Sequence, residues 1–230
     1  MIKENINKIL AETKDYDSKL ICVSKTRTCE EIMEAYNTGI RDFGENHVQE
    51  LVQKRSILPK DINWHMIGHL QTNKVKDLLK DKVFLIHSVD SLKLAKEINK
   101  RSSMKQDILL EINIASEESK YGFNPDEDEL NEILEEIKSL ENINCIGLMC
   151  VAPNTSNPEE NTKYFERMQE LNKSLGLSIL SMGMTNDYLY ACQCGSTYIR
   201  VGTGIFGERD YKKAISFRNI VILILNVVML

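Results

Sequence analysis

The stretch that decides the fold runs from residue 107 to residue 150: DILLEINI at 107–114, PDEDELNEILEEIKSL at 125–140 and INCIGLMC at 143–150. The first and third segments are nearly continuous apolar runs, which is the pattern of parallel strands buried on both faces. The middle segment places its apolar residues from Leu130 to Leu140 on one helical face, with Glu and Lys opposite. The stretch therefore predicts a strand–helix–strand unit.

The same alternation extends over most of the chain. About eight β-like runs can be counted, at 20–25, 42–46, 63–68, 83–89, 107–114, 143–150, 177–184 and 198–206. Helical patterns lie between them, most clearly at 91–100, 126–140 and 158–175. Alternating units of this kind predict a parallel sheet. About eight units in 230 residues favour a single (β/α)8 TIM-type barrel over an open doubly wound sheet.

The composition describes an ordinary globular protein, with 42% hydrophobic residues, 27% charged residues and a net charge of −5. No global basic field would draw it to nucleic acid or to a membrane, so neither partner is expected. The six cysteines include no Cys-x-x-Cys pair and the start lacks the apolar core of a signal peptide. We therefore expect reduced thiols, no metal site and a cytoplasmic protein.

The C-terminal end departs from this pattern. We expect the barrel to occupy residues 1–211 and an atypical apolar tail to occupy 212–230. Residues 220–230 are apolar except for Asn226, which is too short a run to span a bilayer. A final strand or packed tail is the favoured interpretation, and a membrane-facing or aggregation-prone end is the alternative.

In such a barrel the chemistry lies at the carboxyl ends of the strands. Lys25 ends the first apolar run, so its amine could point into the mouth of the barrel. Burial lowers the pKa of a lysine amine in general, and a neutral amine can condense with an aldehyde. A lysine that reaches past the strand end to solvent is the alternative interpretation.

The seventh and eighth runs close with SMGMT at 181–185 and IRVGTG at 199–204. Glycines allow backbone N–H groups to approach an anion, and Ser181 and Thr203 add hydroxyl donors. These segments therefore predict a phosphate site, with turn glycines as the plainer reading. The glycines from 202 to 207 also match a dinucleotide fingerprint, but no strand–helix–strand unit follows them, so we reject that function.

Several motifs together resemble the pyridoxal phosphate homeostasis protein family. They cover about residues 20 to 211 in the family's order. They are VSKT at 23–26, FGEN at 43–46, WHMIGHLQTNK at 64–74, HSVD at 87–90, SKYGF at 119–123, GLM at 147–149, SMGMTND at 181–187, GST at 195–197 and IRVGTGIFGER at 199–209.

The resemblance implies a barrel like the N-terminal domain of alanine racemase that carries pyridoxal 5′-phosphate, with Lys25 holding it as an internal aldimine. Arg200 would face the pyridine nitrogen, and Asn46 would lie beside the ring. The remaining implied contacts are Ser181, Gly183, Gly202 and Thr203 for the phosphate, with Met149 and His65 in the pocket wall.

The implied role of Arg200 bears on function. A guanidinium only donates hydrogen bonds, so it does not keep a proton on the ring nitrogen and the ring stays a poor electron sink. We expect no second acid–base domain after the eighth run. We therefore expect a non-catalytic, monomeric carrier in intracellular vitamin B6 homeostasis, with PLP-dependent apoenzymes as possible partners. The alternatives are a single-barrel PLP-dependent amino-acid racemase or lyase, and a phosphosugar-binding barrel without PLP.

Overall fold

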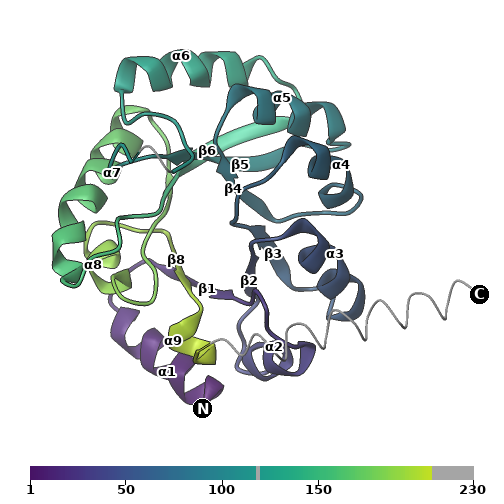
Figure 1. The fold of residues 1–230 in the computed structure, drawn as a ribbon, viewed down its shortest axis with the longest axis vertical. Helices are drawn as coiled ribbons and strands as arrows, with labels where there is room; N and C mark the ends of the chain where they lie inside the picture. Colours follow the sequence, from purple (N-terminus) through teal and green to yellow (C-terminus); the bar gives the residue numbers. More distant parts are fainter. Residues whose placement is uncertain (118–119, 209–230) are drawn as a thin grey trace, which may run out of the picture.

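Eight parallel strands close into one barrel in the order of the sequence, which confirms the predicted fold (Figure 1). The computed structural model describes residues 1–117 and 120–208. The strands are β1 (Lys19–Val23), β2 (Asp42–Glu45), β3 (Asn63–Met66), β4 (Leu85–Val89), β5 (Gln106–Ile112), β6 (Ile143–Cys150), β7 (Ile179–Ser181) and β8 (Tyr198–Val201). Since β8 pairs with β1, the described sheet has no free edge.

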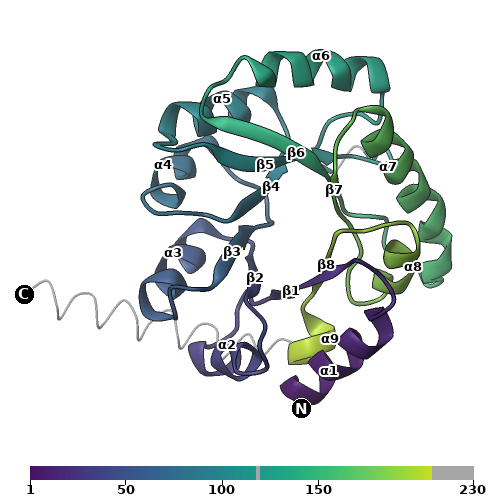
Figure 2. The ribbon, with the colours of Figure 1, turned by 180° about the vertical axis from the view of Figure 1, so that it is seen from behind.

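Helices surround this barrel on its outside, as both views show (Figures 1 and 2). They are α1 (Ile2–Thr13), α2 (Cys29–Tyr36), α3 (Val48–Ile57), α4 (Val75–Leu78), α5 (Leu92–Arg101), α6 (Glu127–Lys138), α7 (Thr162–Ser174), α8 (Tyr188–Gln193) and α9 (Thr203–Phe206), with 3₁₀ turns η1 (Thr72–Lys74) and η2 (Pro158–Asn161). Within the described ranges, no helix has both the length and the apolar character needed to cross a membrane.

The eighth predicted strand was too long. Sequence predicts a strand over 198–206, but β8 ends at Val201 and α9 begins at Thr203. The apolar pattern continues because Ile205 and Phe206 are buried helix residues. A short buried helix and a buried strand share this pattern. The predicted tail at 212–230 lies outside the described residues, so the predicted boundary at 211 stays a prediction.

The barrel separates two apolar cores. The larger core lies between strands and helices, whereas a smaller cluster lies inside the barrel. The inner cluster comprises Ile21, Leu85, Leu109, Met149 and Tyr198. Because side chains alternate along a strand, Ile21 on the inside of β1 places position 25 on the same side, just beyond the strand's carboxyl end.

Candidate functional site

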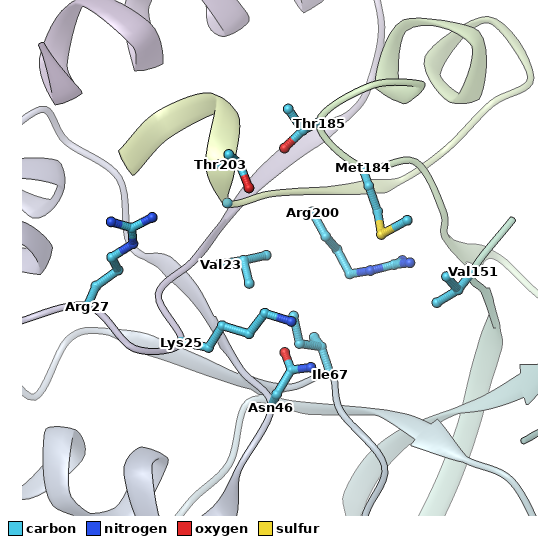
Figure 3. Close-up of a pocket in the computed structure, with 11 residues that line it drawn as sticks. Val23, Lys25, Arg27, Asn46, Ile67, Val151, Met184, Thr185, Arg200 and Thr203 are labelled. Atoms are coloured by element: carbon cyan, nitrogen blue, oxygen red, sulfur yellow. The ribbon is translucent and has the colours of Figure 1, made fainter. Parts of the chain in front are cut away.

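A pocket opens among the segments that follow the strands. This is the end of the barrel at which active sites lie in proteins of this fold. It contains about 670 Å³ of space outside protein atoms, counting the part open to solvent. Its lining residues, shown in Figure 3, are Val23, Lys25, Arg27, Asn46, Ile67, Val151, Met184, Thr185, Arg200, Gly202 and Thr203.

Lys25 extends from the end of β1 into this pocket, with its amine on the side of Asn46 (Figure 3). The two peptide groups that flank Lys25 are both held. The carbonyl of Ser24 accepts a hydrogen bond from Lys54 Nζ (2.7 Å), and the N–H of Thr26 donates to Glu50 Oε1 (2.6 Å). Thr26 has a φ of 65°, a left-handed conformation that a β-branched residue rarely adopts. These contacts therefore fix a strained turn around Lys25.

The contacts that hold the turn come from a buried cluster between β2 and α3. Lys54 is 1% exposed, and its Nζ lies 2.7 Å from Glu45 Oε1 and 2.6 Å from Glu50 Oε1. The hydroxyl of Ser24 also donates to Glu45 Oε1 (2.6 Å). Burial raises the pKa of the Glu45 carboxyl, and the neighbouring Lys54 opposes that shift. One ammonium thus joins helix α3 to the turn that carries Lys25.

Arg200 enters the pocket from β8, on the inside of the barrel (Figure 3). Its Nη2 donates to the Cys150 carbonyl (2.8 Å) and its Nη1 donates to Ser181 Oγ (2.6 Å). Burial lowers the pKa of Arg200, while Cys150 and the Glu111 carboxyl oppose that shift. The guanidinium is therefore a rigidly held donor at the base of the pocket.

The third wall is built from the ends of β7 and β8. Thr185 Oγ1 accepts a hydrogen bond from the N–H of Gly204 (3.2 Å), which ties the two segments together. Figure 3 shows the hydroxyls of Thr185 and Thr203 on the same side of the pocket. A Cβ on Gly202 would lie 3.3 Å from Val23 Cβ, so glycine permits the close approach of β8 to β1.

The donor set fits an anionic ligand. The lining holds Lys25, Arg27 and Arg200, two threonine hydroxyls and no carboxylate among the described lining residues. Arg27 is turned toward the edge of the pocket in Figure 3, where it donates to the Gly207 carbonyl. Cations, hydroxyls and glycine-rich backbone are the groups that bind phosphate esters.

The structure brings together five of the residues predicted for the site: Lys25, Asn46, Arg200, Gly202 and Thr203 line the pocket. Four others are not among its lining residues. Ser181 lies behind the guanidinium, Gly183 forms the turn after β7, Met149 belongs to the inner apolar cluster and His65 is fully buried in the barrel.

Sequence reasoning missed several lining residues. Val23 could have been found from strand alternation, since it lies two residues before Lys25 on the same face. Thr185 lies within the segment 181–185 that was predicted to bind phosphate, so its hydroxyl could have been predicted to line the pocket. Ile67, Val151 and Met184 carry no chemical signature, so only the tertiary structure assigns them to the pocket.

Comparison with known proteins places the chain in a defined class. The model of the family described as alanine racemase, N-terminal domain, matches residues 1–210. Curated relatives carry a more specific name. The chain is 44% identical over 204 residues to the pyridoxal phosphate homeostasis protein of Aquifex aeolicus, covering 84% of this chain and 88% of the relative. It is 39% identical to the human protein of that name, covering 85% of this chain and 78% of the relative.

Solved structures agree with this classification. PipY of Synechococcus elongatus without PLP superposes with a TM-score of 0.82 at 32% identity, covering 90% of this chain and all of PipY. PipY with PLP bound gives a TM-score of 0.77 at the same identity. An alanine racemase from Clostridium difficile, at 17% identity and a TM-score of 0.73, shares the fold. The chain belongs to the pyridoxal phosphate homeostasis protein family.

Proposed function

We propose that this protein binds pyridoxal 5′-phosphate covalently through the Lys25 amine and takes part in vitamin B6 homeostasis without catalysing a reaction. The observation that carries the proposal is the convergence of Lys25 and Arg200 on one pocket whose described lining has no carboxylate. The names of the relatives and the PLP-bound structure of PipY support the same ligand.

The proposed contacts follow from the geometry of the pocket. Lys25 would bind the aldehyde carbon, and Arg200 would donate to the ring nitrogen. Thr185, Thr203 and the backbone at Gly202 would bind the phosphate, and Asn46 would lie against the ring. Contacts to the cofactor from Ser181, Gly183, Met149 and His65 stay predictions.

We propose the absence of turnover because few side chains in the pocket lining can transfer a proton. Bound pyridoxal phosphate would supply an aldehyde that condenses with amines. Arg27 and Arg200 are guanidiniums, which keep their protons in proteins. Among the described lining residues this leaves Lys25 as the side chain able to move a proton. Racemisation needs an acid and a base on opposite faces of the substrate, and a single amine occupies one face.

The setting of this function is also proposed. The cysteines at positions 22, 29, 145, 150, 192 and 194 are free thiols, which suits a reducing cytoplasm. We propose that the protein acts there as a monomer and passes the cofactor to PLP-dependent apoenzymes.

Borohydride reduction followed by peptide mapping tests the covalent attachment. The full-length protein, incubated with PLP and reduced, should carry a stable adduct on the peptide that contains Lys25. Lys25→Ala should abolish the adduct, whereas Lys8→Ala, which removes an exposed lysine of α1, should leave it unchanged. A protein that stays colourless, or an adduct on another lysine, would contradict the proposal.

Exchange of amino-acid α-protons in deuterated water tests the absence of turnover. The expected rate is no higher than that of free PLP. A faster rate that is lost in Lys25→Ala would instead establish a racemase or lyase.

A further inference from the structure

A chain of hydrogen bonds runs through the inside of the barrel and ends at the pocket. Arg200 Nη1 donates to Ser181 Oγ (2.6 Å), and Ser181 Oγ lies 2.8 Å from His87 Nδ1. His87 Nε2 lies 2.9 Å from His65 Nδ1, and His65 Nε2 lies 2.9 Å from Asp42 Oδ1. The chain thus connects β8, β7, β4, β3 and β2.

This chain is closed to water along most of its length. Ser181, His87 and His65 are fully buried, Arg200 is 4% exposed and the Asp42 side chain is 21% exposed at the opposite end. The two imidazoles pack against each other and against the Tyr198 ring. A buried polar chain of this kind is stable only if every member has a hydrogen-bond partner.

The identities of the end groups fix the direction of every proton in the chain. Arginine can only donate, and an ionised aspartate can only accept. His65 must therefore carry its proton on Nε2 to donate to Asp42, which leaves Nδ1 as an acceptor. His87 must in turn donate from Nε2, so its Nδ1 accepts the hydroxyl proton of Ser181.

The surroundings favour neutral imidazoles, as this assignment requires. Burial lowers the pKa of His65, with Lys19 adding to that shift and Asp42 opposing it. Burial also lowers the pKa of His87 well below its ordinary value, and both His65 and Arg200 add to that shift. The rings of Tyr198 and Phe84 also pack against the His65 imidazole.

We infer that Ser181, His87, His65 and Asp42 are positioning residues, which form a one-directional hydrogen-bond chain that orients the Arg200 guanidinium toward the bound ligand. The inference rests on the proposed function, because it assigns Arg200 to the ring of pyridoxal phosphate. Ser181 acts through Arg200, since its single proton is committed to His87. Asp42, on the far side of the barrel from the pocket, anchors the acceptor end.

Nitrogen-15 NMR of the histidine side chains tests the proton direction without any ligand. The chain has four histidines, so the imidazole signals can be assigned by single substitutions. At pH 7 we expect both His65 and His87 to be neutral, with the proton on Nε2. An Nδ1–H form or an imidazolium at either position would overturn the assigned direction.

Ligand binding by variants tests the positioning role. Ser181→Ala removes the link between Arg200 and His87, and we expect the PLP Kd to rise about 5- to 30-fold. The absorption band of the bound cofactor should also shift. Ser178→Ala, an exposed serine just before β7, is the matched control and should change neither quantity.

Substitutions at His87 separate positioning from packing. The amide of His87→Gln has an acceptor oxygen and an NH2 group with two N–H donors, so it can replace both hydrogen bonds of the neutral imidazole and should retain most of the affinity and the wild-type band. His87→Leu has a similar volume but can neither donate nor accept a hydrogen bond. It should therefore lose both the PLP affinity and the wild-type absorption band.

If Ser181→Ala and His87→Leu change only the thermal stability, the chain has a structural role and the inference is wrong. If the wild-type protein binds no PLP, the proposed function fails instead, while the NMR result still decides the proton direction.

Discussion

Lys54→Met should be the most informative single substitution outside the pocket. Lys54 is 1% exposed and donates to the Ser24 carbonyl, Glu45 Oε1 and Glu50 Oε1 at 2.6–2.7 Å. Methionine has a similar length and apolar volume, so the substitution removes the charge with little change in packing. It leaves two carboxylates facing each other, one of them with no exposed area.

The expected cost follows from that burial. Removing one partner of a buried ion pair costs about 3–5 kcal/mol, because the other charge stays buried without compensation. In a chain of this size this corresponds to a fall in Tm of about 6–20 °C. The Ser24 carbonyl loses a hydrogen bond in the same step, so we also expect slower and less complete formation of the PLP adduct on Lys25.

Urea and thermal unfolding followed by circular dichroism measure the free energy of unfolding, and absorbance measures adduct formation. Lys8→Met is the matched control, because the Lys8–Glu12 pair is exposed and such pairs contribute about 0–1 kcal/mol. Replacing Glu45 by Met as well should recover part of the loss, since the uncompensated carboxylate is then gone. Equal Tm values for Lys54→Met and Lys8→Met would refute the reasoning.

Three further substitutions test the turn after β7, a partly buried carboxyl group near Arg200 and the pocket wall. Gly183→Ala should lower the free energy of unfolding by about 2–4 kcal/mol, because φ is 90° and the new Cβ would lie 2.5 Å from Ala191 Cβ. Gly39→Ala is the control: φ is 100°, but no atom lies within 4 Å of the new Cβ, so the loss should be smaller. Burial and the nearby Asp90 raise the pKa of Glu111 from 4.5 to about 7, so its contribution to stability is full below pH 4.5 and is lost as the pH rises through 7. The free energy of unfolding of Glu111→Gln minus that of the wild type should therefore be about 1–3 kcal/mol larger at pH 8 than at pH 4 in urea unfolding. The same difference at both pH values would contradict this. Thr185→Val should raise the PLP Kd about 5- to 30-fold in a fluorescence titration while the Lys25 adduct persists, and an unchanged Kd would remove Thr185 from the phosphate site.

The sequence by itself determined the barrel, because strands buried on both faces must be continuous apolar runs and the intervening helices must be amphipathic. It also predicted that the Lys25 amine could lie in the mouth of the barrel, near the glycine-rich segments, since the carboxyl ends of parallel strands meet at one face. The family followed from motif order. These features depend on short-range patterns that are visible in a single chain.

Only the tertiary structure decided which polar groups meet inside the barrel. His65 and His87 are 22 residues apart, and Ser181 is a further 94 residues along the chain, so no spacing rule predicts their contact. The structure also separated Ser181, which lies behind Arg200, from Thr185, which lines the pocket. Side-chain contacts across a closed barrel depend on strand register and on the direction of each side chain, and neither quantity is encoded in the local apolar pattern.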